Sequence, residues 1–283
     1  MRTGKIMGLL VSLVAASITF CACDKPAPPP TEGETPLTIG SSFPLESAVL
    51  GETRTITVSL PYKYHENPDS YPVLYLVDGG FEQDFVPMAG MSALASLSGQ
   101  FHEFILVGVQ TNNRYYELTA PSEVPFDLEK IPVNGGADKF RQHLLDEVKP
   151  FIEGRYRTSG EDAIIGESLA GLFIAETFLR APASFDHYVA VSPSLWWLEM
   201  TLSREAAGLL NAAGFPANRS FYFTIADEGG DMHEGVERLA AALENHAPDS
   251  LNWWYRPMLD EHHNTIYSPA TLQALRLIFA PEQ

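Results

Sequence analysis

The residues best suited to chemistry include a serine within a run of small residues. Ser168 lies in AIIGESLAGLF, residues 163–173, where an apolar run ends and an apolar helical stripe begins. A serine on a sharp strand-to-helix turn is exposed at the edge of a sheet, with the helix N-terminus aimed at the reaction site. Such a serine attacks an ester carbonyl when a histidine takes its proton and a carboxylate orients that histidine. Ala170 departs from the strict G-x-S-x-G pattern, so the motif alone leaves a non-catalytic turn open.

Candidate partners for this serine occur later in the chain. Three acids follow an apolar run in the segment FYFTIADEGGDM: Asp227, Glu228 and Asp231. Two adjacent histidines lie in DEHHNTIYSP, before the last helical pattern: His262 and His263. An orienting carboxylate is expected at the end of a strand, and a catalytic histidine in a later loop. The residue types alone leave open which acid and which histidine act.

The elements that must position these residues alternate along the chain. Continuous apolar runs, typical of strands buried on both faces of a parallel sheet, occur at residues 72–77, 104–109, 163–165, 188–191 and 221–226. Apolar residues at helical spacing occur at 140–152, 172–179, 236–243 and 272–279. Ser268-Pro269, a capping hydroxyl followed by a proline in the first turn, predicts the start of the last helix. Residues 43–61, rich in Thr and Val, predict antiparallel strands. The alternation predicts an α/β fold with a mostly parallel central sheet and helices on both faces.

Several separated segments resemble the putative-esterase family of α/β-hydrolases, which includes enterochelin-type siderophore esterases, feruloyl and acetyl-xylan esterases, and S-formylglutathione hydrolases. The matching segments occur in the family's order: YPVLYLVDG, GVQTNNRYYELT, the helix ending VKPFIEGRYRT, GESLAGLF, VAVSPSLWW and EHHNTIYSP. The resemblance implies an α/β-hydrolase fold with the chain order serine, acid, histidine. No stretch between Tyr188 and Phe221 is long enough for a large lid domain.

The resemblance also assigns the catalytic roles. It implies that Ser168 is the nucleophile and that Glu228 orients the histidine, although a shift of one residue would exchange Glu228 with Asp227. The family pattern of acid, any residue, histidine and a small or polar residue selects His263 as the base over its neighbour His262. We therefore expect a triad of Ser168, Glu228 and His263.

Backbone and pocket groups complete the expected site. An oxyanion site needs two N–H donors, and we expect them from Leu169, which follows the nucleophile, and from Gly80, to which the resemblance points. Arg114 is a candidate contact for an anionic substrate group, unless it pairs with Glu117 or another local carboxylate. Trp197, the second of two adjacent tryptophans, is a candidate for lining a substrate pocket, although packing is the alternative role.

Other chemistries are disfavoured by composition and spacing. Both cysteines precede residue 37, which excludes thiolate catalysis and disulfides in the body of the chain. Adjacent histidines point in different directions, and His233-Glu234 lacks the second histidine of a zinc-protease helix, so we expect no metal. No cofactor is expected either. The formal net charge of -18 argues against nucleic acid as a partner.

The N-terminal residues predict export. Residues 1–23 combine a basic start with an uncharged apolar run too short to span a membrane comfortably, which is a signal-peptide pattern. A small residue before Cys23 favours a lipoprotein signal with lipidation at Cys23, although Phe20 stands where leucine is usual. Proline-rich residues 24–36 predict a linker, and residues 37–283 a single esterase domain. We expect a lipid-anchored enzyme facing the periplasm; cleavage of a plain signal, giving a soluble periplasmic or secreted protein, is the alternative.

Three functions are compatible with these residues. The leading hypothesis is a serine carboxylic-ester hydrolase that forms an acyl-enzyme on a small-molecule or polysaccharide-linked ester. The alternatives are acyl transfer to an alcohol, as in the similar mycolyltransferases, and a catalytically silent binding protein of the same fold. The intact serine, acid and histidine positions count against the silent protein. The sequence leaves the natural ester open among siderophore backbones, feruloylated or acetylated polysaccharides and small thioesters.

Overall fold

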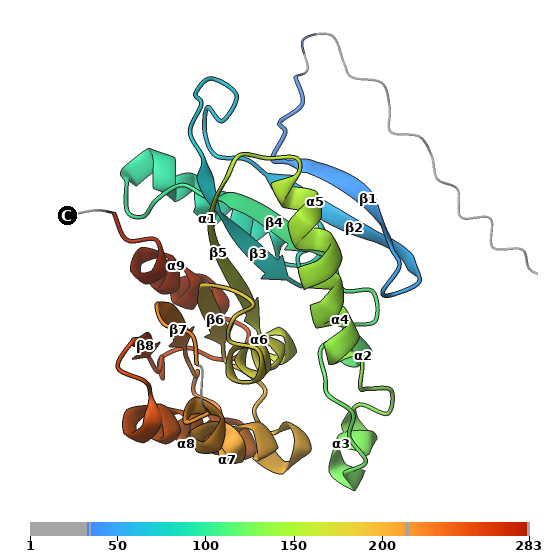
Figure 1. Cartoon of the computed structure of the whole chain (residues 1–283), viewed down its shortest axis with the longest axis vertical. Coiled ribbons are helices and arrows are strands. Elements are labelled where there is room, and N and C mark those ends of the chain that lie inside the picture. Colours follow the sequence, from blue (N-terminus) through green and yellow to red (C-terminus); the bar gives the residue numbers. More distant parts are fainter. Residues whose placement is uncertain (1–32, 34, 213–214, 282–283) are drawn as a thin grey trace, which may run out of the picture. The chain divides into compact units, whose positions relative to one another are not determined.

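A central sheet organises the part of the chain that begins at Thr38 (Figure 1). The computed structural model describes residue 33, residues 35–212 and residues 215–281. The expected signal peptide, the lipidation site Cys23 and most of the expected linker lie outside the described residues.

The sheet is mostly parallel, with an antiparallel edge. In the described residues its strands are ordered β1-β2-β4-β3-β5-β6-β7-β8. Their bounds are β1 Ser41–Ser47, β2 Glu52–Ser59, β3 Tyr71–Val77, β4 Ile105–Val109, β5 Thr158–Glu167, β6 His187–Val191, β7 Arg219–Phe223 and β8 Leu251–Tyr255. Strand β2 runs antiparallel to both β1 and β4, whereas β4, β3, β5, β6, β7 and β8 run parallel. The carboxyl ends of the parallel strands therefore share one edge of the sheet, where ligand sites of such folds are built.

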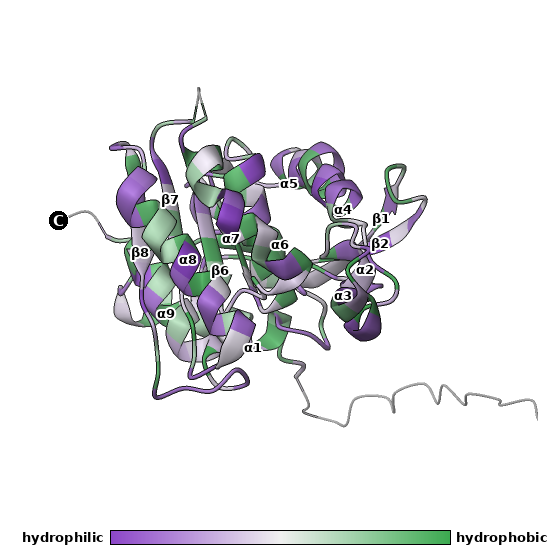
Figure 2. Cartoon of the chain, turned by 90° about the horizontal axis from the view of Figure 1, so that it is seen from below, coloured by the Kyte–Doolittle hydropathy of each residue, from purple (hydrophilic) through white to green (hydrophobic). Residues whose placement is uncertain are grey.

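Helices connect the strands and cover the sheet. Their bounds are α1 Phe85–Ser98, α2 Arg114–Glu117, α3 Pro125–Lys130, α4 Ala137–His143, a π-helical turn η1 Leu144–Val148, α5 Lys149–Glu153, α6 Leu169–Arg180, α7 Trp197–Leu210, α8 Gly230–His246 and α9 Tyr267–Ile278. In the view from below, α4, α5 and α7 lie on one side of the sheet and α1 and α9 on the other (Figure 2). Among the described residues, none of these helices has the length and apolar character that crossing a bilayer requires.

Two hydrophobic cores form because strand residues alternate between the faces of the sheet. In β3, Val73, Tyr75 and Val77 pack toward α4, α6 and α8, whereas Leu74 and Leu76 pack toward α1 and α9. All five side chains are at most 2% exposed. A strand buried on both faces needs a continuous apolar run, which explains the pattern in the sequence.

The predicted architecture is confirmed, with small differences at the element ends. The expected antiparallel strands are β1 and β2, and the expected final helix is α9. Helix α9 begins at Tyr267, one residue before Ser268, and in the described structure no side chain caps it. The predicted cap at Ser268 is therefore wrong. Helix α7 and its loops join β6 to β7, so the described residues of this connection form no large lid domain.

Candidate active site

Ser168 occupies the turn between β5 and α6. Strand β5 ends at Glu167 and α6 begins at Leu169, so the turn is a single residue long. Ser168 has φ 61° and ψ -117°, a conformation that costs energy for a residue with a side chain. Backbone bonds hold it there, because its N–H donates to Val191 O at 2.9 Å and its carbonyl accepts from Ser194 N at 3.0 Å. The turn therefore presents the hydroxyl at the carboxyl edge of the sheet.

Small residues around the turn allow the strand and the helix to approach each other. A Cβ placed on Gly166 would lie 2.6 Å from the methyl carbon of Ala170, closer than two carbon atoms can pack. A Cβ on Gly171 would lie 2.9 Å from Val191 O. The methyl group of Ala170, which departs from the G-x-S-x-G pattern, is thus accommodated by glycine at position 166.

A histidine and a carboxylate meet beside this turn. His263 Nδ1 lies 3.0 Å from Glu228 Oε1, and the side chains are 45% and 12% exposed, respectively. Of the two ring nitrogens, Nδ1 takes part in this contact. Asp227 is exposed, and its backbone N–H donates to the carbonyl of Glu261. His262 is also exposed, and its backbone N–H donates to a threonine hydroxyl.

Two buried serines, which sequence reasoning missed, link these segments. Ser192 Oγ donates to Glu228 Oε1 at 2.7 Å and accepts from Ala226 N at 3.1 Å, fixing the carboxylate in place. Ser194 Oγ lies 3.3 Å from Ser168 Oγ. Both serines follow β6 in the segment VAVSPSLWW, whose resemblance to the family was the only signal that marked them. They join the serine turn to the carboxylate through one short loop.

The hydrogen bond between His263 and Glu228 dominates the local electrostatics. This bond raises the pKa of the His263 imidazole above its ordinary value of 6.5, although burial acts in the opposite direction. For Glu228, burial favours a higher pKa, but hydrogen bonds from His263 and Ser192 outweigh burial and lower the pKa. Glu228 therefore remains charged when His263 takes up a proton, which stabilises an imidazolium.

Two further carboxyl groups lie near this pair. Burial raises the pKa of Glu167 to about 7, and the charge of His263 opposes that increase. Burial, aided by the charge of Asp78, raises the pKa of Asp84 to about 6. One oxygen of Glu167 and the hydroxyl of Tyr267 are buried without a hydrogen-bond partner in the described part of the chain. Sequence reasoning missed this acidic surrounding, although Glu167 lies within the serine motif.

The expected oxyanion donors lie on two different elements. Leu169 is buried and is the first residue of α6, so its N–H is one of those that a helix leaves without an intrahelical partner. Gly80 is buried in the loop between β3 and α1. Its N–H donates to Oε1 of Gln83 at 2.9 Å. The N–H of Gly80 therefore already has an acceptor within the protein, the side chain of Gln83.

The two candidate substrate contacts, Arg114 and Trp197, both have partners within the protein. Arg114 Nε pairs with Asp78 Oδ2 at 2.6 Å, and its side chain is 34% exposed. Glu117, the alternative partner of Arg114, pairs instead with Arg54 at 2.8 Å. Trp197 is 3% exposed and its indole N–H donates to Ala120 O, so it packs in the hydrophobic core.

An apolar pocket lies next to the loop that carries Ser194. Its volume is about 320 Å³, and it is lined by Phe126, Lys130, Trp196, Asp231 and Met232. Phe126 and Trp196 pack edge to face with their ring centroids 5.9 Å apart. Lys130 Nζ lies 5.5 Å from the centroid of the Phe126 ring. Of the two adjacent tryptophans, Trp196 is partly exposed and lines this pocket, whereas Trp197 is buried.

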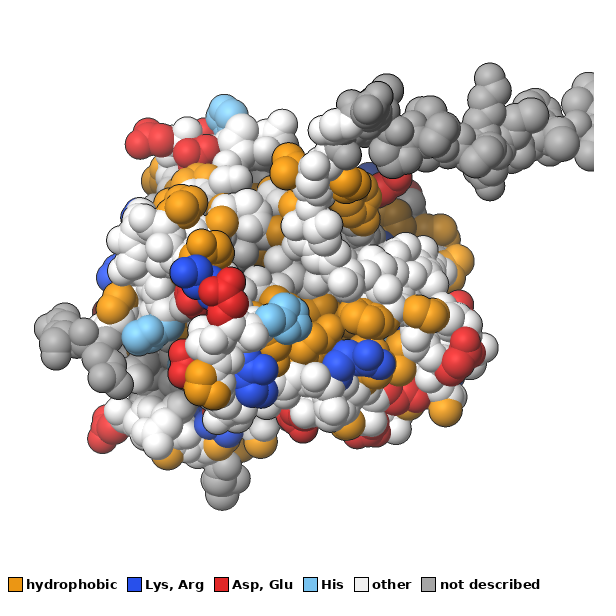
Figure 3. Space-filling model, turned by 90° about the horizontal axis from the view of Figure 1, so that it is seen from above, with side chains coloured by type: hydrophobic (Ala, Val, Ile, Leu, Met, Phe, Trp, Pro, Cys, Tyr) orange, Lys and Arg blue, Asp and Glu red, His pale blue; other side chains and the backbone are white. Residues whose placement is uncertain are grey.

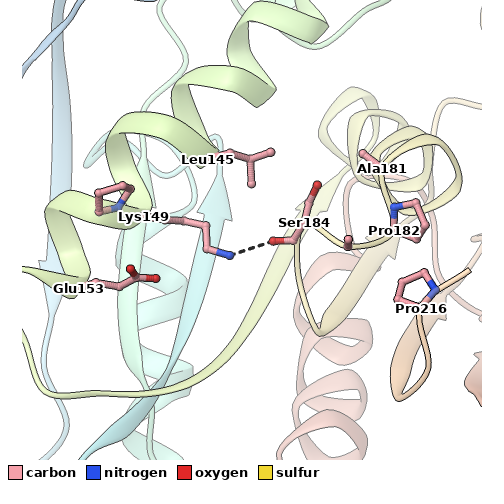
Figure 4. A pocket seen from close by; sticks show the side chains of 9 residues that line it. Leu145, Lys149, Glu153, Ala181, Pro182, Ser184 and Pro216 are labelled. Carbon is pink, nitrogen blue, oxygen red and sulfur yellow. Dashed lines mark hydrogen bonds between the residues drawn. The ribbon is translucent and has the colours of Figure 1, made fainter. Parts of the chain in front are cut away.

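Another pocket, of about 550 Å³, is lined by none of the candidate site residues. Figure 4 shows the side chains that line it. It is lined by η1, α5 and the loops that precede β6 and β7, at the amino ends of the parallel strands. Its lysine, Lys149, donates to Ser184 O at 2.9 Å and pairs with Asp162 Oδ2 at 2.5 Å, so internal partners already satisfy the charge. In the view from above, hydrophobic side chains also gather beside basic ones (Figure 3). Apolar surface alone therefore does not mark the site.

The side chains that commonly bind metal ions were also examined for clustering in the described residues. No group of three or more His, Cys, Asp or Glu side chains in the described residues is arranged to hold a metal ion. The chemistry available at the carboxyl edge of the sheet is that of a hydroxyl, an imidazole, a carboxylate and backbone N–H groups.

Known proteins with this fold and these segments were compared with the chain. Over 243 residues the chain is 28% identical to the siderophore triacetylfusarinine C esterase of Aspergillus fumigatus, covering 78% of this chain and 80% of that protein. The crystal structure of an IroE-like serine hydrolase from Shewanella oneidensis superposes with a TM-score of 0.75 at 26% identity, covering 85% of this chain and 80% of that one. The BES protein from Bacillus cereus has a TM-score of 0.76 at 23% identity, covering 88% and 98% of the two chains. The second structure supports the fold alone.

Most of the elements that carry the candidate site residues lie within one family match, whereas the loop of His263 lies beyond it. The model of the family described as Putative esterase matches residues 47–240, more than half of the chain. This range includes the loop with Gly80, the serine turn, the loop with Ser192 and Ser194, and Glu228. The chain belongs to the putative-esterase family of α/β-hydrolases.

Proposed function

We propose that the protein is a serine carboxylic-ester hydrolase that works through an acyl-enzyme on Ser168. The observation that carries the proposal is the pairing of His263 Nδ1 with Glu228 Oε1 beside a strained serine turn. The pair lies near the serine turn, since the charges of His263 and Glu228 both affect the pKa of Glu167, the residue before Ser168. Membership of an esterase family supports the same reaction.

In the proposed first half-reaction, Ser168 Oγ attacks the ester carbonyl carbon while His263 Nε2 accepts the hydroxyl proton. The carbonyl oxygen becomes an oxyanion, which the N–H groups of Leu169 and Gly80 stabilise. When the C–O bond to the alcohol breaks, His263 returns the proton to the leaving alkoxide. The products of this half-reaction are an alcohol and an ester of Ser168.

In the second half-reaction, water takes the place of the serine hydroxyl. His263 accepts a proton from water as the water oxygen attacks the acyl carbon, and the proton then passes to Ser168 Oγ as the acid leaves. Glu228 remains ionised throughout and stabilises the imidazolium in each half-reaction. Its lowered pKa supports this role.

We further propose a small-molecule ester as the substrate, with siderophore esters as the first class to test. The support is the name of the relative from Aspergillus fumigatus, which acts on a siderophore ester. The partly exposed Arg114 and the apolar pocket at Trp196 offer charged and apolar contacts for such a molecule. Feruloyl and acetyl esters of polysaccharides are the comparison substrates.

The test compares hydrolysis of short-chain p-nitrophenyl esters by the wild-type protein with hydrolysis by Ser168→Ala and His263→Ala. We expect each variant to lose most turnover, and the double variant to be little worse, because the residues act as a unit. His262→Ala is the matched control and is expected to retain activity, since His262 is exposed beside His263. Full activity in Ser168→Ala would contradict the proposal, and ester products with added glycerol would indicate acyl transfer instead.

A further inference from the structure

The N–H group of Gly80 already has an acceptor within the protein. Gln83, three residues later, places its side-chain Oε1 2.9 Å from Gly80 N. A backbone bond in the opposite direction, from Gln83 N to Gly80 O at 3.0 Å, closes the loop. Because Gly80 is buried, its N–H needs a partner when no substrate is bound. The Gln83 side chain meets that need in place of water.

The orientation of the Gln83 amide is fixed by its other contacts. Its Nε2 lies 3.3 Å from the carbonyl oxygen of Thr111, an atom that can only accept, and 2.9 Å from the Thr111 hydroxyl. The hydroxyl in turn donates to Asp78 Oδ1, and Arg114 holds the other oxygen of Asp78 at 2.6 Å. The amide nitrogen must therefore face Thr111, which leaves the amide oxygen facing Gly80.

We propose that Gln83 is a positioning residue whose amide oxygen occupies the oxyanion donor of Gly80 in the free enzyme and is displaced by the transition state. This inference rests on the proposed function, in which Gly80 stabilises an oxyanion. Displacement exchanges one hydrogen bond for another: the Gly80 N–H leaves Gln83 Oε1 and binds the substrate oxygen. No covalent bond of Gln83 changes.

The exchange favours the transition state over the bound ester. A neutral ester carbonyl is no stronger an acceptor than the amide oxygen it would replace, whereas hydrogen bonds to an ionised acceptor are roughly twice as strong as neutral ones. The Gly80 donor therefore becomes available to the substrate only as negative charge develops. An interaction made only in the transition state changes kcat and leaves KM unchanged.

The test replaces the acceptor without changing the length of the side chain. Gln83→Met removes the amide oxygen and frees the Gly80 N–H for the neutral ester as well as for the oxyanion, so we expect kcat/KM to rise about 2- to 10-fold, mainly through a lower KM, the range for one neutral hydrogen bond. A trifluoromethyl ketone, which adds to the serine and forms an oxyanion, should bind more tightly by a similar factor. Gln83→Glu supplies a charged acceptor that also repels the oxyanion, so kcat is expected to fall about tenfold or more.

Gln110→Met is the matched control. The Gln110 side chain packs beside Gly80, since a Cβ on Gly80 would lie 3.0 Å from Gln110 Cγ. In the described structure the Gln110 side chain makes no hydrogen bond with Gly80, so this variant should leave kcat/KM and inhibitor affinity unchanged. A fall in kcat/KM and weaker inhibitor binding in a folded Gln83→Met variant would overturn the inference, because Gln83 would then support the donor.

A readout independent of turnover separates this inference from the proposed function. Exchange of the Gly80 amide hydrogen, followed by NMR in the free protein, should be faster in Gln83→Met than in the wild type. An unchanged exchange rate would overturn the inference even if the protein hydrolyses esters. Absence of ester hydrolysis by the wild-type protein, with faster exchange in the variant, would defeat the proposed function and leave the occupied donor established.

Discussion

Glu228 and Asp227 are adjacent acids with different surroundings. Glu228 contacts His263 and Ser192, whereas Asp227 is exposed. We predict that Glu228→Gln lowers kcat by about 10²- to 10⁴-fold, because a neutral amide neither orients nor stabilises the imidazolium as well. Asp227→Asn, the matched control, should stay within about tenfold of the wild type. Steady-state kinetics on one ester decides between them, and the reverse order of effects would make Asp227 the acid.

The pH dependence of hydrolysis follows from the raised pKa of His263. The imidazole must be neutral to accept a proton, so kcat/KM should rise with pH and reach half its maximum above 6.5. The hydrogen bond that His263 Nδ1–H donates to Glu228 is the largest cause of the raised pKa. In Glu228→Gln the rise should therefore move to lower pH. A rise that stays in place, measured as kcat/KM across pH, would show that another group controls the acidic limb.

At the residue scale, the sequence allowed prediction of residues whose types are distinctive at their positions. Ser168 lies in a glycine-bearing turn, and His263 lies in a late loop. Ser192, Ser194 and Gln83 could not be predicted from their types, because serine and glutamine occur in most loops. Their roles depend on which atoms the fold brings within about 3 Å, as in the contact between Gln83 and Gly80.

Helix α3 supports a strained segment at the start of α7. Leu198, Glu199 and Met200 have positive φ angles between 53° and 63°, which residues other than glycine rarely adopt in succession. Asp127 of α3 is 1% exposed, and its Oδ2 accepts from Leu198 N at 3.0 Å and from Ser122 Oγ at 2.6 Å. The carboxylate therefore holds a turn that follows the loop of Ser194.

We predict that Asp127→Ala lowers the free energy of unfolding by about 2–3 kcal/mol, because one buried and one partly buried donor lose their acceptor. Glu129→Ala on the same helix is the control, and it should change stability by about 0.5 kcal/mol or less, since Glu129 is exposed and pairs with its exposed neighbour Lys130. Urea unfolding measures both variants. Equal stability of the two variants would contradict the supporting role of Asp127.

At the element scale, the sequence predicted elements with a continuous or periodic apolar pattern. Strands β3 to β6 and helices α6, α8 and α9 coincide with the predicted segments to within a few residues, apart from the longer amino-terminal extension of β5. Helices α1 and α3 were missed, because α1 mixes Ala, Ser, Gly and Met, and α3 has only six residues. The left-handed turn in α7 was missed because it contains no glycine to signal it. Tertiary contacts from Asp127 and Trp197 stabilise it instead.

At the scale of the whole molecule, the parallel sheet explains why distant segments act together. Ser168 follows β5, Ser192 and Ser194 follow β6, and Glu228 lies beyond β7. Because these strands are neighbours and parallel, the residues after them meet at one edge. We propose that residues 37–283 form one catalytic domain and that residues 24–36 link it to a lipid anchor at Cys23.

The anchor makes a prediction about where the protein partitions in cells. The wild-type protein should be found in the membrane fraction, because the several acyl chains of a bacterial lipoprotein bind stably where one would not. Cys23→Ser should move it to the soluble fraction or block its processing, whereas Cys21→Ser should leave it with membranes. Fractionation followed by mass spectrometry of the mature N-terminus measures this. An unmodified N-terminus beyond Cys23 in the wild type would contradict the anchor.

Trapping the acyl-enzyme tests directly whether Ser168 is the nucleophile. The protein would be mixed rapidly with p-nitrophenyl butyrate, quenched in acid within the first turnovers and digested with trypsin. We predict a butyryl group on the peptide of residues 158–180, located by fragmentation at Ser168 and absent from Ser168→Ala. A butyryl group on another residue, or continued hydrolysis by Ser168→Ala, would contradict it.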